Sequence, residues 1–250
     1  GSAGAGPLRT YLRARWRQED ADEALWRRRT TVVAVLYILA FALVLSLIGF
    51  DLVMAADPHW YSTLFGAYSF VKAIYTGFGA IIILAALLHL SPRFAFRLDG
   101  GQLHDISKLF FAFCLVWADF FYAQFVVIWY GNIPEETAYV IERTLRAPWA
   151  PLAWTVFILG FVLPFLILIN KRVKTMPAAM AAICAAAIIA IWLEHFLLLG
   201  PALFHGAARL PVGLGDVLVG LGFTGLLALA LSRYLNAFPE LVHPAPKDAP

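Results

Sequence analysis

The sequence predicts an all-α integral membrane protein with six transmembrane helices. Of its 250 residues, 62% are hydrophobic, and the mean hydropathy is +0.77. A soluble domain is about half apolar by composition, so this chain is unusually rich in apolar residues. The apolar residues form long, nearly charge-free runs, and a run of about 20 residues is long enough to cross a bilayer as a helix. Lys and Arg residues gather on one side of these runs.

Six runs meet the length that a transmembrane helix needs. Residues typical of helix ends separate them: Asp57-Pro58 before the second run, Asp105 as a cap for the third, and Gly200-Pro201 after the fifth. A basic amphipathic segment (1–30) precedes the transmembrane domain (31–237), and a Pro-rich tail (238–250) follows it. The predicted spans cover residues 32–54, 60–89, 107–130, 149–170, 177–199 and 213–236.

The distribution of basic residues predicts how the spans are oriented. With six spans, both termini lie on the same side, and 15 of the 19 Lys and Arg residues lie there too. Three lie on the opposite side, and Lys72 lies within a span. Because Lys and Arg are enriched in cytoplasmic loops, both termini should be cytoplasmic. We call this side the basic end. The opposite side, the aromatic end, carries Trp60, Tyr61, Trp129, Tyr130, Trp149 and Trp154.

Several chemistries have no support in the sequence. The chain shows no nucleotide-binding loop, nucleophile elbow or zinc motif, and a net charge of +3 does not indicate nucleic-acid binding in a chain this apolar. Cys114 and Cys184 lie in different apolar runs and form no metal-ligand spacing. The histidines are scattered, so we expect neither a metal site nor a haem.

Ionisable residues inside membrane spans are costly, and each is by default a candidate for function. Such residues also hold and pass protons, so we group them with three interfacial residues as candidates for a proton path. The candidates are Asp51, His59, Lys72, Asp119, Glu135, Glu136, Glu194, His195 and Asp216.

Lys72 and Asp119 are the deepest of these candidates. Counting 12 residues from Trp60 to Lys72, and from Asp119 to Gly131, places both about 18 Å from the aromatic end. An isolated charge at that depth costs on the order of 3 kcal/mol. We therefore predict a buried Lys72–Asp119 pair, either a structural clamp between helices or part of a proton relay.

Other candidates have structural alternatives. Asp216 would also cap the sixth helix, and Pro134-Glu135-Glu136 fits the first turn of a surface helix as well as a proton entrance. The Trp and Tyr residues of the aromatic end are typical of the aromatic belt at a membrane interface, although a quinone-binding slot would use the same rings. These alternatives stay open at the level of sequence.

Several segments resemble the F subunit of bacterial alternative complex III. They are FDLVMAADPHWYSTLFGAY (50–68), HDISKLFFAFCLVWADFFYAQFVVIWYGNIPEET (104–137), LPFLILINKRVK (163–174), WLEHFLLLGPAL (192–203) and GLGDVLVGLGFTGL (213–226). This subunit belongs to the NrfD-like superfamily, which is that of the polysulfide-reductase membrane subunit. The resemblance extends from about residue 24 to residue 237 and implies an NrfD-like bundle.

The resemblance implies a membrane subunit of a quinol-oxidising respiratory complex in the bacterial inner membrane. Partners would include a second NrfD-like subunit, an iron–sulfur protein and cytochrome c subunits. It also implies proton-path roles for Asp51, His59, Glu135, Glu136 and Glu194. The chain departs from that family in showing six helices where about ten are usual. It also has Lys72 and Asp119 where the family has a small and an aromatic residue.

These observations lead to a first hypothesis and its rivals. The first is a proton-conducting or coupling subunit without a redox centre of its own. A second is direct binding of a quinone, menaquinone or ubiquinone, by His59, Trp60, Tyr61 and Asp119. A third is a structural scaffold that anchors partner subunits. The chain would then be a non-catalytic or a quinone-site subunit, and the sequence does not decide which. A secondary transporter is disfavoured because no internal repeat is visible.

Overall fold

The computed structural model describes residues 23–58, 60–92, 94–204 and 206–238, and all the regular elements in these ranges are helices. Six helical stretches are long and apolar enough to cross a membrane, which indicates a multi-pass membrane protein. The elements are α2 (Glu23–Ile48), η1 (Gly49–Val53), η2 (Met54–Ala56), α3 (Phe65–Leu90), α4 (Gly100–Gly131), α5 (Pro134–Thr144), α6 (Trp149–Phe157), η3 (Ile158–Val162), α7 (Leu163–Leu168), η4 (Val173–Thr175), α8 (Pro177–Leu203) and α9 (Leu214–Ala237).

Each predicted span corresponds to a helix, but several boundaries differ. Residues 57, 58 and 60–64 form only turns and irregular backbone, so α3 begins at Phe65 rather than at residue 60. Helix α4 begins seven residues earlier than predicted, at Gly100, because Asp99 caps it by accepting hydrogen bonds from the backbone N–H groups of Gly101 and Gln102. Asp105 is therefore not the cap. It lies within α4 and pairs with Lys108 at 2.9 Å.

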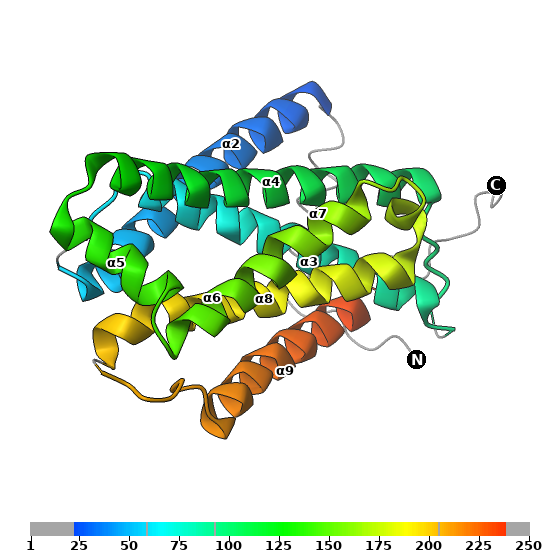
Figure 1. The fold of residues 1–250 in the computed structure, drawn as a ribbon. Coiled ribbons are helices and arrows are strands. Elements are labelled where there is room, and N and C mark those ends of the chain that lie inside the picture. The colour runs from blue at the N-terminus through cyan, green and yellow to red at the C-terminus, as the bar shows by residue number, and fades with distance from the viewer. Residues whose placement is uncertain (1–22, 59, 93, 205, 239–250) are drawn as a thin grey trace, which may run out of the picture.

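The long helices lie roughly antiparallel, with α3 and α8 packed together at the centre of the bundle (Figure 1). Helix α4 covers one side of α3, and the α6–η3–α7 span packs on α8. Helix α2 packs on α3, and α9 lies outside α8 (Figure 1). The core residues of α3, α4 and α8 include Tyr75, Phe110 and Met180, each fully buried. This central layer positions the candidate site.

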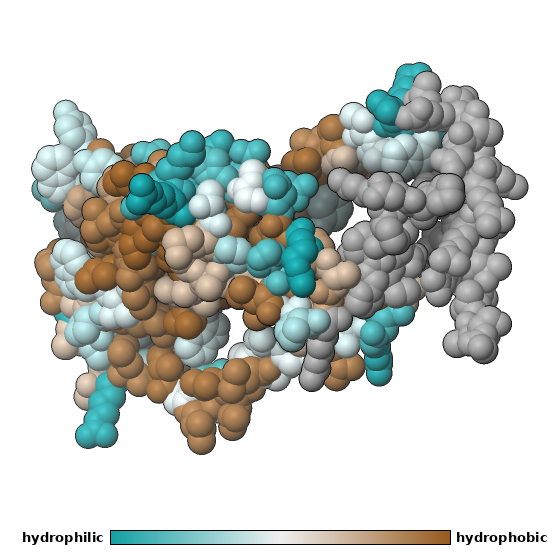
Figure 2. All heavy atoms as spheres, turned by 90° about the vertical axis from the view of Figure 1, so that its right-hand side faces the viewer, coloured by the Kyte–Doolittle hydropathy of each residue, from teal (hydrophilic) through white to brown (hydrophobic). Residues whose placement is uncertain are grey.

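The two ends of the bundle differ in character. The start of α2, the end of α9 and the loops 91–99 and 169–176 lie at one end (right in Figure 1), and α5 lies at the other. Figure 2 looks onto the first end, where hydrophilic side chains gather beside hydrophobic ones. This is the basic end, and its described residues include Arg97, Lys171 and Arg172. The predicted N-terminal segment lies largely outside the described residues, except that 23–30 belong to α2; of the tail, only Phe238 is described.

A proline shapes the fourth span. Pro164 has no backbone N–H and therefore cannot bond to the carbonyl four residues earlier, that of Gly160. The span has a π-helical segment there, η3, and the hydroxyl of Tyr75 donates to the Gly160 carbonyl at 2.9 Å. A Cβ at Gly160 would lie only 3.1 Å from the Trp117 ring, so the small residue also permits close packing of α4 on this span. The Gly160 carbonyl in the π-helical segment thus links the fourth span to Tyr75 of α3.

The outer helices expose most of their surface. None of the residues of α9 is buried, and where α2 continues into η1 the buried residue is Gly49, which lies against α3. There, a Cβ at Gly49 would lie 2.5 Å from the Ser69 hydroxyl, so the two backbones approach closely, as small residues allow in membrane helices. The remaining apolar surface of these two helices suits contact with lipid or with other membrane helices.

Candidate functional site

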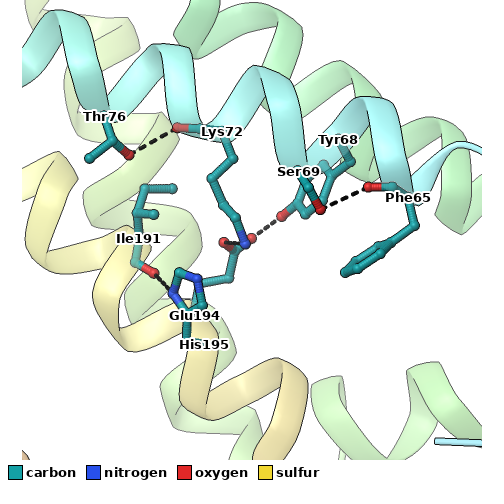
Figure 3. Close-up of polar contacts among 8 residues, drawn as sticks. All are labelled: Phe65, Tyr68, Ser69, Lys72, Thr76, Ile191, Glu194 and His195. Atoms are coloured by element: carbon teal, nitrogen blue, oxygen red, sulfur yellow. Dashed lines mark hydrogen bonds and ion pairs between the residues drawn. The ribbon is translucent and has the colours of Figure 1, made fainter. Parts of the chain in front are cut away.

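A lysine and a glutamate meet inside the bundle. Lys72 of α3 and Glu194 of α8 form an ion pair, with 3.0 Å between Nζ and Oε2. Only 7% of Lys72 and 2% of Glu194 is exposed. Because α3 and α8 are the two central helices, both charges lie away from the surface, and each is the other's counter-ion (Figure 3).

The hydroxyl of Tyr68 completes this cluster. Tyr68 lies one turn before Lys72 on α3 and donates a hydrogen bond to Oε1 of Glu194 (Figure 3). The ammonium of Lys72 also lies 5.3 Å from the centre of the Tyr68 ring, within the range of a cation–π contact. The carboxylate thus has a different partner on each oxygen. We call Lys72, Glu194 and Tyr68 the buried triad.

The predicted pair between Lys72 and Asp119 is wrong. The residue count that placed them at one depth treated 60–64 as helix; Lys72 actually lies about two turns into α3, whereas Asp119 lies about three turns before the end of α4. Asp119 also faces the other way. It follows the buried Trp117 by two residues, which is about 200° around the helix, and it is exposed. The partner of Lys72 comes instead from α8, far along the chain.

An aromatic cleft opens beside the triad toward the aromatic end. The cleft is small, with a cavity volume of about 40 Å³, and Tyr68 belongs both to its lining and to the triad. Two buried polar atoms of lining residues, Nε1 of Trp60 and Oε1 of Gln124, have no hydrogen-bond partner in the described part of the chain. The lining consists of Trp60, Phe65, Tyr68, Phe121, Gln124, Phe125, Ile128, Tyr139 and Leu198.

A cation–aromatic stack holds one wall of this cleft. The rings of Trp60 and Tyr139 stack with centroids 4.0 Å apart. The guanidinium carbon of Arg143 lies 3.5 Å from the centre of the Tyr139 ring. Arg143 is 4% exposed and pairs with Asp57 at 3.2 Å. It also donates to the backbone carbonyl of Leu198 at 3.0 Å. Through these contacts Arg143 ties the helix α5 to the 57–60 segment and to α8.

Burial changes the acidity of one ring in this wall. It raises the pKa of the Tyr139 phenol to about 12, and the neighbouring Arg143 charge offsets only part of that rise. Tyr139 therefore stays neutral at any physiological pH. It serves in the cleft as a neutral ring and hydroxyl.

The other predicted residues do not join the triad. His195 follows Glu194 but is exposed, and its Nδ1 bonds with the carbonyl of Ile191 at 2.7 Å (Figure 3). Asp216 accepts a hydrogen bond from the N–H of Gly213 at 2.8 Å. This is the contact expected if Asp216 caps the sixth membrane helix. Asp51 is exposed on η1. His59 lies outside the described residues.

The structure also places the candidate residues of the aromatic end. Glu135 and Glu136 lie in the first turn of a helix, α5, as the surface-helix interpretation predicted. Tyr61 is exposed and cannot line the cleft with Trp60, which is buried. Most of the other rings face outward, as an interface belt does; the exposed ones are Tyr61, Trp129, Tyr130 and Trp154, whereas Trp149 is buried.

Sequence reasoning missed Asp57, Gln124, Tyr139 and Arg143 as parts of the site. In the sequence, Asp57 is typical of a helix start, and Arg143 is one of the three Lys and Arg residues predicted to lie at the aromatic end. One signal was present: Tyr139 and Arg143 are four residues apart, so they share a face of the predicted surface helix. Among the described residues, no group of three or more His, Cys, Asp or Glu side chains is placed to hold a metal ion.

Comparisons with known proteins do not assign this chain to a family. No protein-family model matches it, and no curated protein matches it.

Proposed function

We propose that the chain is a proton-handling subunit of a quinol-oxidising respiratory complex of the alternative complex III type. It would lie in the bacterial inner membrane with both termini in the cytoplasm, form an NrfD-like bundle, and carry no redox centre of its own. Its partners would be a second NrfD-like subunit, an iron–sulfur protein and cytochrome c subunits. The family part of this proposal is supported by the resemblance of the quoted segments.

The observation that carries the proton-handling part is the buried triad. An ammonium, a carboxylate and a phenol in contact provide three groups that bind protons within a bundle whose core is largely apolar. A proton on Lys72 needs to move only to the adjacent carboxylate for the pair to become neutral. Such a transfer is the chemistry that buried lysines and carboxylates are suited to, because burial disfavours their charged forms.

The route from the aromatic end would pass through the cleft. Tyr68 connects the cleft to Glu194, since its side chain lines the cleft and its hydroxyl binds the Glu194 carboxylate. Of the earlier relay candidates, Glu194 and Lys72 remain at the centre of this route. Asp119 lies off it, because its side chain is exposed, and the ring of His195 bonds instead with the carbonyl of Ile191.

The test compares single and double replacements of the pair in the intact complex. Glu194→Gln and Lys72→Met should each lower proton uptake per electron transferred, measured in complexes reconstituted into liposomes. The double variant Lys72→Met/Glu194→Leu removes both charges and restores an apolar interior, which proteins tolerate well. We expect it to assemble and to lose proton uptake as well.

The double variant separates proton transfer from a purely structural clamp. If it assembles and takes up protons normally, the pair is only a clamp, and the chain is better described as a scaffold. Asp105→Asn is the matched control, because Asp105 is an exposed carboxylate at the basic end, paired only with Lys108. Its replacement should leave proton uptake unchanged.

Binding of a quinone headgroup in the aromatic cleft is a second candidate function. It is favoured by the two buried polar atoms that lack partners there, the Trp60 N–H donor and the Gln124 amide oxygen. The N–H would donate to a quinone carbonyl, and the amide oxygen would accept from a quinol hydroxyl. His59, Tyr61 and Asp119, the other residues first considered for a quinone, are not needed: the first is outside the described residues, and the other two are exposed.

Photolabelling with an azido-menaquinone or azido-ubiquinone tests this second function. We expect labelled peptides from α4 and from the segment that contains Trp60, and less labelling in Trp60→Phe and Gln124→Leu. Tyr61→Phe is the control, since that ring is 70% exposed. Equal labelling in all variants would exclude the cleft as the quinone site.

A further inference from the structure

The outer face of α4 carries a charge that the described chain does not neutralise. Asp119 is exposed, and no hydrogen bond or ion pair to its carboxylate is present among the described residues. The residues one turn before and after it, Leu115 and Tyr122, are 38% and 62% exposed. Further along the same face lie Ala112, which is exposed, and Val126, which is half-buried. The face is therefore apolar except for one carboxylate and one phenol near its middle.

This carboxylate lies at membrane depth. It is the only charged residue between Leu109 and Gly131, a stretch within one of the membrane-spanning helices, and about three turns separate it from the end of α4. Membrane helices turn such residues toward the interior of a bundle or toward a partner, because lipid offers neither water nor a counter-charge. Here the interior is excluded, since Trp117 occupies that side of α4.

The neighbouring elements leave this face open. Among the described elements, helix α4 packs against α3, α5, η4 and the fourth span. Helix α2 packs on α3, and α9 lies beyond α8, across the bundle from α4 (Figure 1). Among the described residues no element covers Asp119, which leaves its face free for another membrane-embedded segment.

We propose that this face of α4 binds a transmembrane helix of a partner subunit that carries Lys or Arg at the depth of Asp119. Charge complementarity selects this occupant, because a buried carboxylate is stabilised by a cation that also donates a hydrogen bond. The Tyr122 hydroxyl, one turn away, can accept a second hydrogen bond from the same cation. A second copy of this chain would place two carboxylates together, and an acyl chain would leave the charge unpaired. The proposal does not rest on proton transfer by the buried triad.

Site-specific photocrosslinking in native membranes tests the proposal. The photoreactive amino acid p-benzoylphenylalanine replaces Leu115 or Tyr122, one at a time, and mass spectrometry identifies the crosslinked peptide. We expect a transmembrane peptide of a different protein, with Lys or Arg within a turn of the crosslinked residue. Asp119→Leu should lower the crosslinking yield about tenfold or more, since it leaves the partner's charge unpaired. Asp105→Leu, on the same helix near the basic end, should not.

Two further measurements make the result decisive. Asp119→Lys should also abolish the crosslink, and exchanging the partner's basic residue for Asp should restore it. The purified single chain with Asp119→Leu should keep its thermal unfolding midpoint, because Asp119 has no contact to lose in the described chain. Crosslinks only to lipid, to a second copy or to this chain itself would overturn the proposal. So would an unchanged yield in Asp119→Leu, or a lowered midpoint of the isolated variant.

Discussion

Lys72 and Glu194 stabilise the bundle only as a pair. Each is nearly inaccessible, and each would be an unpaired charge in an apolar interior if the other were removed. Breaking a buried pair by removing one partner is strongly unfavourable, whereas replacing both with apolar residues is often neutral. This asymmetry makes a double replacement informative about stability as well as about proton transfer.

Glu194→Leu alone should destabilise the protein by about 3–5 kcal/mol, because it leaves the ammonium of Lys72 buried and unpaired. Lys72→Met/Glu194→Leu should recover most of that loss. Unfolding in a series of detergent mixtures, followed by circular dichroism, measures both variants. Additive effects in the double variant would show that the two side chains do not interact.

The pH dependence of stability should show the contribution of the Tyr139 phenol. Its pKa in the folded protein is about 12, above the value of about 10 for a tyrosine in an unfolded chain. Between these two values the unfolded chain loses this proton and the folded one keeps it, so the contribution of Tyr139 to stability falls as pH rises from 10 to 12. Below pH 10 the contribution is fully present. Thermal unfolding midpoints at pH 9 to 12 test this, and Tyr139→Phe should show a shallower decline.

At the scale of helices, glycines decide how closely two elements pack. A Cβ at Gly200 of α8 would lie 2.1 Å from the ring of Trp149 at the start of α6, which is 3% exposed. The ring is rigid and enclosed, so it has little room to move aside. In contrast, a Cβ at Gly222 of α9 would meet nothing within 4 Å.

Gly200→Ala should therefore destabilise the protein by about 1–3 kcal/mol, the usual effect of overpacking a core. Gly222→Ala is the matched control, and it should be neutral or slightly stabilising because alanine favours helix. The measurement is again the unfolding midpoint in detergent. Trp149→Phe should rescue Gly200→Ala; if it does not, the contact with the ring is not the cause.

At the scale of the whole molecule, six spans place alternate loops at opposite ends. The exposed residues Arg28 and Lys171 belong to the basic end, and the exposed Glu135 belongs to the aromatic end. Both native cysteines are fully buried, so they should not react with a charged reagent in the folded protein. New surface cysteines can therefore report on the topology.

We expect Arg28→Cys and Lys171→Cys to react with a membrane-impermeant maleimide only after the membrane is opened. Glu135→Cys should react in intact spheroplasts. These results follow from cytoplasmic placement of the Lys- and Arg-rich end. Labelling of Arg28→Cys and Lys171→Cys from opposite sides would contradict an even number of spans between them.

The sequence by itself determined the helical membrane class and the six spans, because apolar run length and helix-start residues are local properties. It also singled out Lys72 and Glu194 as costly charges that need an explanation, since a charge in an apolar run is visible without a structure. Helix boundaries were less certain. The short non-helical segment before Phe65 and the Asp99 cap were missed, and both changed the depth at which side chains lie.

Only the tertiary structure decided which charges meet. Two side chains at a similar depth contact each other only if their helices turn those faces together, and helix rotation is set by packing of the whole core. Trp117 takes the inner side of α4, so Asp119 faces outward; α8 lies against α3, so Glu194 reaches Lys72. The same packing brings Arg143, Tyr139 and Trp60 together from segments far apart in the chain. Such contacts depend on long-range geometry, which no local pattern encodes.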